Sequence, residues 1–182
     1  MPVENRNKLV SLKKKGVCLH ASAVSVSGKA LLFLGHSTAG KSTISQLLSE
    51  RYPVIADDKV WVSWNRGGLM ICDVSENFHI KENWVNSFAR QAQYPLLAII
   101  RIYKSKKIEI KPVSPKQICR YLIDAVFEVD QQRKQEDLIV IKEWFRLVAK
   151  ISKKIEGWYL TFAKDKIIIS KIHDVFENRY IK

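Results

Sequence analysis

Cysteine is scarce in this sequence, and long apolar runs are missing. The three cysteines, Cys18, Cys72 and Cys119, lie far apart and form no CxxC pair. Their spacing argues against a disulfide framework or a zinc site and suits reduced thiols in a cytoplasm. No apolar stretch approaches the ~20 residues of a membrane-spanning helix, and residues 1–15 are polar and basic, unlike a signal peptide. We therefore expect a cytoplasmic protein that acts without a membrane.

Negative charge is also in short supply, because 31 Lys and Arg outnumber 18 Asp and Glu to give a net charge of +13. A basic surface can attract nucleic acid, anionic lipid, an acidic partner or nucleotide phosphates. The charge is spread along the chain without a long basic block, and the five tryptophans fall on separate segments without forming a stacking ladder. This pattern argues against a nucleic-acid-binding protein.

Apolar residues are plentiful, at 47% of the 182 positions, and their spacing indicates both strands and helices. This content excludes a disordered chain and supports one domain with a substantial core. We expect a single α/β domain with a mixed sheet over residues 1–182, in which 1–16 form a flexible lead-in. The expected strands are 17–26, 30–34, 52–56, 60–64, 69–72, 95–103, 108–111 and 158–162. The expected helices are 41–51, 81–92, 137–150, 167–176 and one that begins at Ser114-Pro115.

Residues 35–42, Gly-His-Ser-Thr-Ala-Gly-Lys-Ser, match the phosphate-loop pattern G-x-x-x-x-G-K-[ST] in full. The glycines let backbone N–H groups turn toward phosphate oxygens, Lys41 brings positive charge to the β and γ phosphates, and Ser42 offers a hydroxyl to Mg²⁺. A buried strand before the motif and a helix after it supply the required context. The predicted nucleotide-binding residues are Gly35, His36, Ser37, Thr38, Ala39, Gly40, Lys41, Ser42 and Thr43, with ATP and Mg²⁺ as the cofactors.

Two adjacent carboxylates, Asp57 and Asp58, follow directly on the strand expected after the loop helix. Ligand sites of open α/β sheets usually lie at such strand tips. Neighbouring side chains of an extended backbone point to opposite sides, so one carboxylate can face the metal with Ser42 while the other faces an acceptor hydroxyl. A carboxylate near the γ-phosphate can take the proton from that hydroxyl. A solvated turn between two strands is the alternative interpretation.

Together with His20, these motifs resemble the catalytic domain of HPr kinase/phosphorylase, which has a His-containing strand, a GxSGxGKS-type loop and an apolar strand ending in Ala-Asp-Asp. The specific resemblance covers residues 17–62 and is loose after residue 95. It implies a P-loop domain similar to the phosphoenolpyruvate carboxykinase nucleotide-binding fold, with ATP–Mg²⁺ chemistry at a hydroxyl. It also implies roles for individual residues: Asp57 as catalytic base, Asp58 and Ser42 as metal-site residues, Lys41 as phosphate-binding catalytic residue and His20 as a supporting active-site histidine.

The sequence departs from the family pattern at the loop and downstream of it. Thr38 stands where the family has a third glycine, and because threonine is β-branched we expect a negative φ there. The Gly-rich segment that follows the family's metal site is missing, as is its acceptor-binding signature. These departures leave the acceptor open.

The leading hypothesis is a kinase that phosphorylates a hydroxyl, preferably a Ser of a protein or peptide, either an HPr-like protein or a ribosomal precursor peptide. The net positive charge favours an acidic acceptor. The alternatives are a small-metabolite kinase and a nucleotide-binding regulator that transfers nothing, and a homo-oligomer stays open. Arg90 and Arg101 are candidates to neutralise the transferred phosphate. We expect Glu76 and His79 to lie in a plain loop, with a metal or substrate loop as the alternative.

Overall fold

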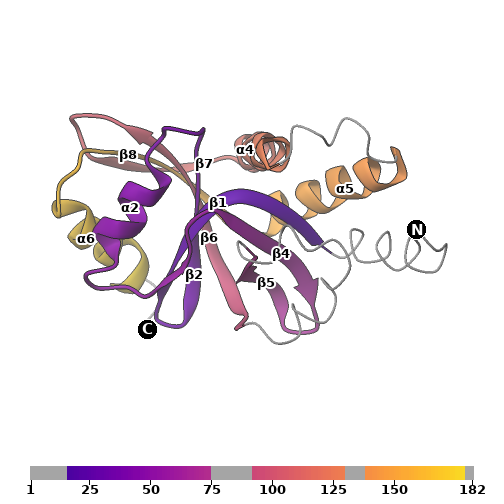
Figure 1. Ribbon diagram of the computed structural model, residues 1–182, viewed down its shortest axis with the longest axis horizontal. Coiled ribbons are helices and arrows are strands. Elements are labelled where there is room, and N and C mark those ends of the chain that lie inside the picture. Colours follow the sequence, from indigo (N-terminus) through magenta and orange to yellow (C-terminus); the bar gives the residue numbers. More distant parts are fainter. Residues whose placement is uncertain (1–15, 75–91, 130–137, 179–182) are drawn as a thin grey trace.

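The computed structural model describes residues 16–74, 92–129 and 138–178, which contain eight strands and four α-helices. In chain order, the elements are β1 (Gly16–Val26), β2 (Lys29–Leu34), α2 (Lys41–Leu48), β3 (Val54–Ala56), β4 (Lys59–Asn65), β5 (Gly68–Asp73), β6 (Tyr94–Lys104), β7 (Glu109–Val113), α4 (Pro115–Glu128), α5 (Leu138–Lys154), β8 (Glu156–Phe162), α6 (Ile167–Ile172) and the π-helical turn η2 (His173–Glu177). Figure 1 labels all of these except β3 and η2. The expected α/β class is confirmed.

The strands form one mixed sheet in the order β2-β1-β4-β5-β6-β8-β7, with β3 paired to β1 at the side. The β2–β6 and β6–β8 pairs are parallel, whereas the other pairs are antiparallel. Because β2 also pairs with β6, the circuit β2–β1–β4–β5–β6 closes on itself. The closure places β1 and β6 on either side of β2, where Ala21 and Arg101 are both paired with Leu34 at the end of that strand.

Helices cover both faces of the parallel part of the sheet (Figure 1). Successive side chains of a strand point to opposite faces, so Leu31 and Phe33 of β2 pack with α2 and α6, whereas Leu32 and Leu34 pack with α4 and α5. The apolar run that makes β2 recognisable in the sequence therefore serves two separate cores. Strand β2, which ends at the phosphate loop, is therefore packed on both of its faces.

Local signals explain most element boundaries. Ser114 caps α4 with a complete capping box, in which its side chain accepts from the Gln117 backbone N–H, and Pro115 occupies the first helical turn. Ser27 and Gly28 form the tight turn between β1 and β2, and their φ angles are positive, at 50° and 77°. The predicted β4–β5 hairpin and the predicted helix after residue 137 are present. No helix in the described ranges is long and apolar enough to cross a bilayer.

A few expectations differ in extent or cannot be compared. Helix α2 ends at Leu48 instead of residue 51, and β3 begins only at Val54. The segment predicted as helix 167–176 is helical but changes from α to π geometry after Ile172. The predicted flexible lead-in 1–16 is wrong at Gly16, which is buried as the first residue of β1 because this strand pairs with β4 from Gly16 onward. The rest of the lead-in and nearly all of the predicted helix 81–92 lie outside the described residues.

A polar cluster ties the C-terminal turn to the far end of α2. Glu177 accepts hydrogen bonds from Tyr52 Oη at 3.0 Å and from Arg51 at 3.1 Å, and it contacts His173 Nδ1 at 2.6 Å. Burial and the bond to Glu177 raise the pKa of Tyr52 to about 12, so its hydroxyl stays protonated and able to donate. This clamp holds the end of α2 that lies away from the phosphate loop.

None of the three cysteines, all of which lie in the described residues, forms a disulfide. Cys18 and Cys72 are packed in a small apolar cluster with Trp61 and Val74. Burial raises the pKa of the Cys72 thiol to about 11, so it is protonated at neutral pH and a poor nucleophile.

Candidate functional site

Residues 35–40 connect the end of β2 to the start of α2 and require glycine at two positions. A Cβ on Gly35 would lie 2.7 Å from Ala39 Cβ and 3.0 Å from Ile102 Cγ1. A Cβ on Gly40 would lie 2.9 Å from the Phe162 ring, and φ there is 98°. The loop is thus pressed against the ends of β6 and β8, and only glycine fits at both contacts.

The expectation of a negative φ at Thr38 is wrong, because φ is 91° at this residue. The loop turns tightly between His36 and Gly40, with Ala39 N–H donating to His36 O at 2.9 Å. Closing this turn forces position 38 into a backbone conformation that β-branched residues avoid. The glycine of the family pattern at this position therefore matches the geometry better than the threonine present here.

We predict that Thr38→Gly stabilises the protein by about 1 kcal/mol, because the strain of a non-glycine residue in this region exceeds the entropy that glycine adds to the unfolded chain. Urea denaturation of both proteins measures the difference. Ser37→Gly is the matched control, since its φ is not positive, and it should be neutral or destabilising. A Thr38→Gly protein less stable than its parent would contradict the strain argument.

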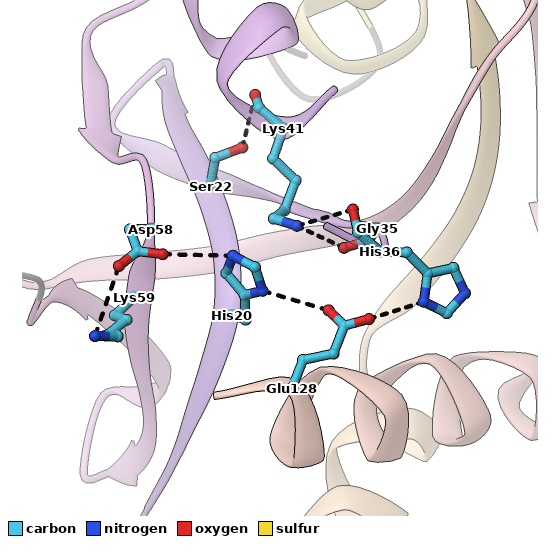
Figure 2. A network of polar contacts seen from close by, with 8 residues as sticks. All are labelled: His20, Ser22, Gly35, His36, Lys41, Asp58, Lys59 and Glu128. Carbon is cyan, nitrogen blue, oxygen red and sulfur yellow. Dashed lines mark hydrogen bonds and ion pairs between the residues drawn. The ribbon is translucent and has the colours of Figure 1, made fainter. Parts of the chain in front are cut away.

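Lys41, the first residue of α2, is only 6% exposed and folds back into the loop. Its Nζ donates to Gly35 O at 2.6 Å and to His36 O at 3.2 Å (Figure 2). Burial lowers the pKa of this ammonium group, while the charges of Glu128, Asp58 and Asp57 oppose the shift. The predicted phosphate-binding lysine is therefore held inside the loop by backbone carbonyls.

A chain of polar contacts links four parts of the fold beside this lysine (Figure 2). Asp58 Oδ1 lies 3.4 Å from His20 Nε2, and His20 Nδ1 lies 3.4 Å from Glu128 Oε2. The other oxygen of Glu128 hydrogen-bonds His36 Nδ1 at 2.8 Å. Strand β1, the bend after β3, the end of α4 and the phosphate loop thus meet at one place.

His20, which sequence reasoning placed in the site, sits at the centre of this chain. Burial is the main cause that lowers the pKa of its imidazole, and Lys41 adds to the effect, whereas Asp58 and Glu128 oppose it. A lowered pKa favours the neutral ring, which has a single N–H and can therefore donate a hydrogen bond to only one of these two carboxylates at a time. Its contacts go to Asp58 and Glu128 and not to Asp57, so its predicted support of the catalytic carboxylate stays a prediction.

The carboxylates of Asp57 and Asp58 are both exposed in the bend between β3 and β4, which is not the extended backbone that the prediction assumed. Pairing of β3 with β1 and a hydrogen bond from Ala21 N–H to Asp58 O at 3.0 Å fix this bend. Asp58 contacts His20 and Lys59, the latter at 3.7 Å. In the described ranges Asp57 makes no hydrogen bond or ion pair, which leaves its carboxylate available.

Glu128 is the site residue that sequence reasoning missed. It is the last residue of α4, a helix whose apolar face is recognisable, and nothing in the surrounding sequence marks its carboxylate. Its position depends on the packing of α4 over β1 and β2. Of the lesser candidates, Arg101 is buried near Lys41, whereas Glu76, His79 and Arg90 lie outside the described residues.

The donor set fits Mg²⁺ only with help from a nucleotide. Ser42 offers an exposed hydroxyl at the start of α2, and Asp58 offers an exposed carboxylate. In residues 16–74, 92–129 and 138–178, no group of three or more His, Cys, Asp or Glu can hold a metal by itself. Mg²⁺ is commonly bound by one or two protein oxygens together with phosphate oxygens and water, so this sparse set suits a metal that arrives with a nucleotide.

Comparisons with known proteins find similarity in structure. No family model matches the sequence, and no curated protein matches it. Among solved structures, the chain is similar to the Hpr(Ser) kinase/phosphatase from Coxiella burnetii, with 12% identity and a TM-score of 0.44 over 90% of this chain and 96% of that chain. A similarity of this size does not carry an activity from one protein to the other.

Proposed function

We propose that this protein is an ATP–Mg²⁺-dependent kinase that phosphorylates a hydroxyl group, preferably a Ser side chain of a protein or peptide. The observation that carries the proposal is the group of carboxylates beside the phosphate loop: Glu128 hydrogen-bonds His36 of the loop at 2.8 Å, and His20 links Glu128 to Asp58, the neighbour of Asp57 in the chain. A loop that only binds nucleotide needs no such carboxylates. Phosphoryl transfer to a hydroxyl needs one to accept the proton.

In the proposed reaction, the loop N–H groups and Lys41 hold the polyphosphate, and phosphate oxygens replace the carbonyls of Gly35 and His36 as partners of the ammonium group. Asp57 accepts the proton of the acceptor hydroxyl. The hydroxyl oxygen forms a bond to the γ-phosphorus while the bond to the β,γ-bridging oxygen breaks, so that ADP leaves. Asp57 suits the role because its carboxylate is exposed and makes no ion pair within the described residues.

Ser42 and Asp58 are the residues proposed to hold Mg²⁺. When bound, the ion would neutralise charge on the phosphate oxygens. His20 and Glu128 would hold Asp58 in place, because each lies next in the chain of contacts. The acceptor is proposed to be acidic around its target hydroxyl, since the protein carries a net charge of +13.

The proposal is tested with γ-labelled ATP, Mg²⁺ and two acceptor sets, one of Ser peptides with acidic or neutral flanks and one of small alcohols. We expect label transfer to Ser peptides, with acidic flanks preferred. Transfer only to small alcohols would indicate a metabolite kinase. Tight ATP binding without transfer to any acceptor would contradict the kinase and favour a nucleotide-binding regulator. Retention by DNA or RNA with a steep salt dependence would revive nucleic-acid binding.

A further inference from the structure

We infer that Arg101 is a phosphate-site residue whose buried, unpaired charge helps to hold the polyphosphate in the loop. The inference rests on the proposed function, because it assigns a further residue to the same site. Arg101 acts on the phosphates through the electric field of its guanidinium group and so positions the ligand, whereas the ammonium group of Lys41 reaches into the loop itself.

The fold places Arg101 directly behind the phosphate loop. In the parallel β2–β6 pair, Arg101 stands opposite Leu34, the residue that precedes Gly35. The carbonyl oxygen of the next residue, Ile102, lies 3.4 Å from the position that a Cβ on Gly35 would occupy. The charges of Arg101 and Lys41 are close enough that Arg101 contributes to the lowered pKa of the lysine. The strand register therefore places the backbone of Arg101 beside the start of the loop, into which the Lys41 ammonium group also reaches.

Within residues 16–74, 92–129 and 138–178, no carboxylate forms an ion pair with the guanidinium group of Arg101. Arg101 is 1% exposed and is the largest fully buried side chain of the described residues. Its Nε and Nη1 are buried without a hydrogen-bond partner in those residues. The rings of Tyr103 and Tyr121 lie 5.6 and 5.3 Å from its Cζ and provide cation–π contacts, but an aromatic face accepts no conventional hydrogen bond.

A buried charge without a partner is costly, and proteins normally pair it or bind an ion against it. The carboxylates of Glu128, Asp58 and Asp57 act on Lys41, but none of them forms an ion pair with Arg101 in the described residues. Burial of Arg101 without such a pair destabilises the fold, and a bound polyphosphate would provide negative charge to this guanidinium group. Because the site is desolvated, this attraction is screened less by salt than one at the surface. Its strength should increase with the negative charge of the ligand.

The test compares Arg101→Met, Arg101→Lys and the control Arg120→Met by calorimetric titration with ATP, ADP and AMP. Arg120 is an exposed arginine on α4, so its replacement changes the net charge equally without altering the loop. We expect Arg101→Met to weaken ATP binding by about tenfold, ADP binding by less and AMP binding hardly at all. Arg101→Lys should stay within about threefold of the parent for ATP, since the charge is kept. Arg120→Met should match the parent.

Thermal unfolding without ligand supplies the second readout. Arg101→Met should melt at or above the temperature of the parent, because methionine fills the site without a buried charge. An Arg101→Met protein that fails to fold or melts well below the parent would overturn the inference, as would equal losses for ATP, ADP and AMP.

Failure of the proposed function gives a different result. If the parent binds no ATP, the kinase proposal fails, and the same variants are titrated with pyrophosphate. Weaker pyrophosphate binding by Arg101→Met than by Arg120→Met would then sustain Arg101 as an anion-binding residue. Equal pyrophosphate binding by the two variants, or binding by neither the parent nor the variants, would overturn it.

Discussion

Asp57→Asn is expected to lower the rate of phosphoryl transfer by about a thousandfold, while ATP binds as tightly as to the parent or slightly more tightly. The amide keeps the shape of the side chain but cannot accept a proton. It also removes a negative charge that lies near Lys41 and therefore near the proposed phosphates. Single-turnover transfer of label from γ-labelled ATP to the best Ser peptide measures the rate, and calorimetric titration measures ATP binding.

Asp174→Asn is the matched control, because it makes the same change at an exposed position on η2, beside the C-terminal clamp. It should transfer label at the rate of the parent.

Asp58→Asn separates the two roles of the aspartate pair, since loss of a metal-site residue should raise the Mg²⁺ concentration needed for half-maximal transfer. Transfer that survives in Asp57→Asn would overturn the assignment of the base. If only Asp58→Asn abolishes it, the two roles are exchanged.

Lys41→Met is expected to weaken ATP binding by at least about 100-fold, because it removes the buried cation that the phosphates would contact. Methionine fills similar space, but the carbonyls of Gly35 and His36 lose the donor that they have in the free protein. Calorimetric titration with ATP–Mg²⁺ measures the effect, and thermal unfolding shows whether the loop itself is weakened.

The control for this prediction is Lys29→Met. Lys29 is exposed at the first position of β2, so the same change of charge occurs at the opposite end of the strand from the loop. ATP binding by Lys29→Met should equal that of the parent. If Lys41→Met binds ATP normally, the nucleotide does not occupy this loop, and the kinase proposal loses its basis.

Much of the fold could be predicted from the sequence because its signals are local. The apolar residues 30–34 predicted a strand buried on both faces, and β2 packs into two cores. Ser114 and Pro115 predicted the start of a helix, and the capping box is formed. The spacing of Gly35, Gly40 and Lys41 predicted a loop between strand and helix. In the structure Gly35 and Gly40 begin and end this loop, and Lys41 is the first residue of the helix.

The predictions failed or fell short where a residue's role depends on distant parts of the chain. The φ angle of Thr38 is positive because the loop must close between His36 and Gly40, although a β-branched residue prefers a negative φ. Glu128 reaches the site only because α4 packs across β1 and β2, and it contacts residues about a hundred positions earlier, His20 and His36. No pattern along the sequence encodes such contacts.

By itself, the sequence determined the α/β class, the phosphate loop and the pair of aspartates after the following strand, because glycine, periodicity and turn residues act over a few positions. Only the tertiary structure decided that His20 lies between two carboxylates and that Arg101 is buried beside Lys41. The physical reason is that burial and charge pairing arise from strand register, and here the parallel β2–β6 register brings together residues 67 positions apart, Leu34 and Arg101.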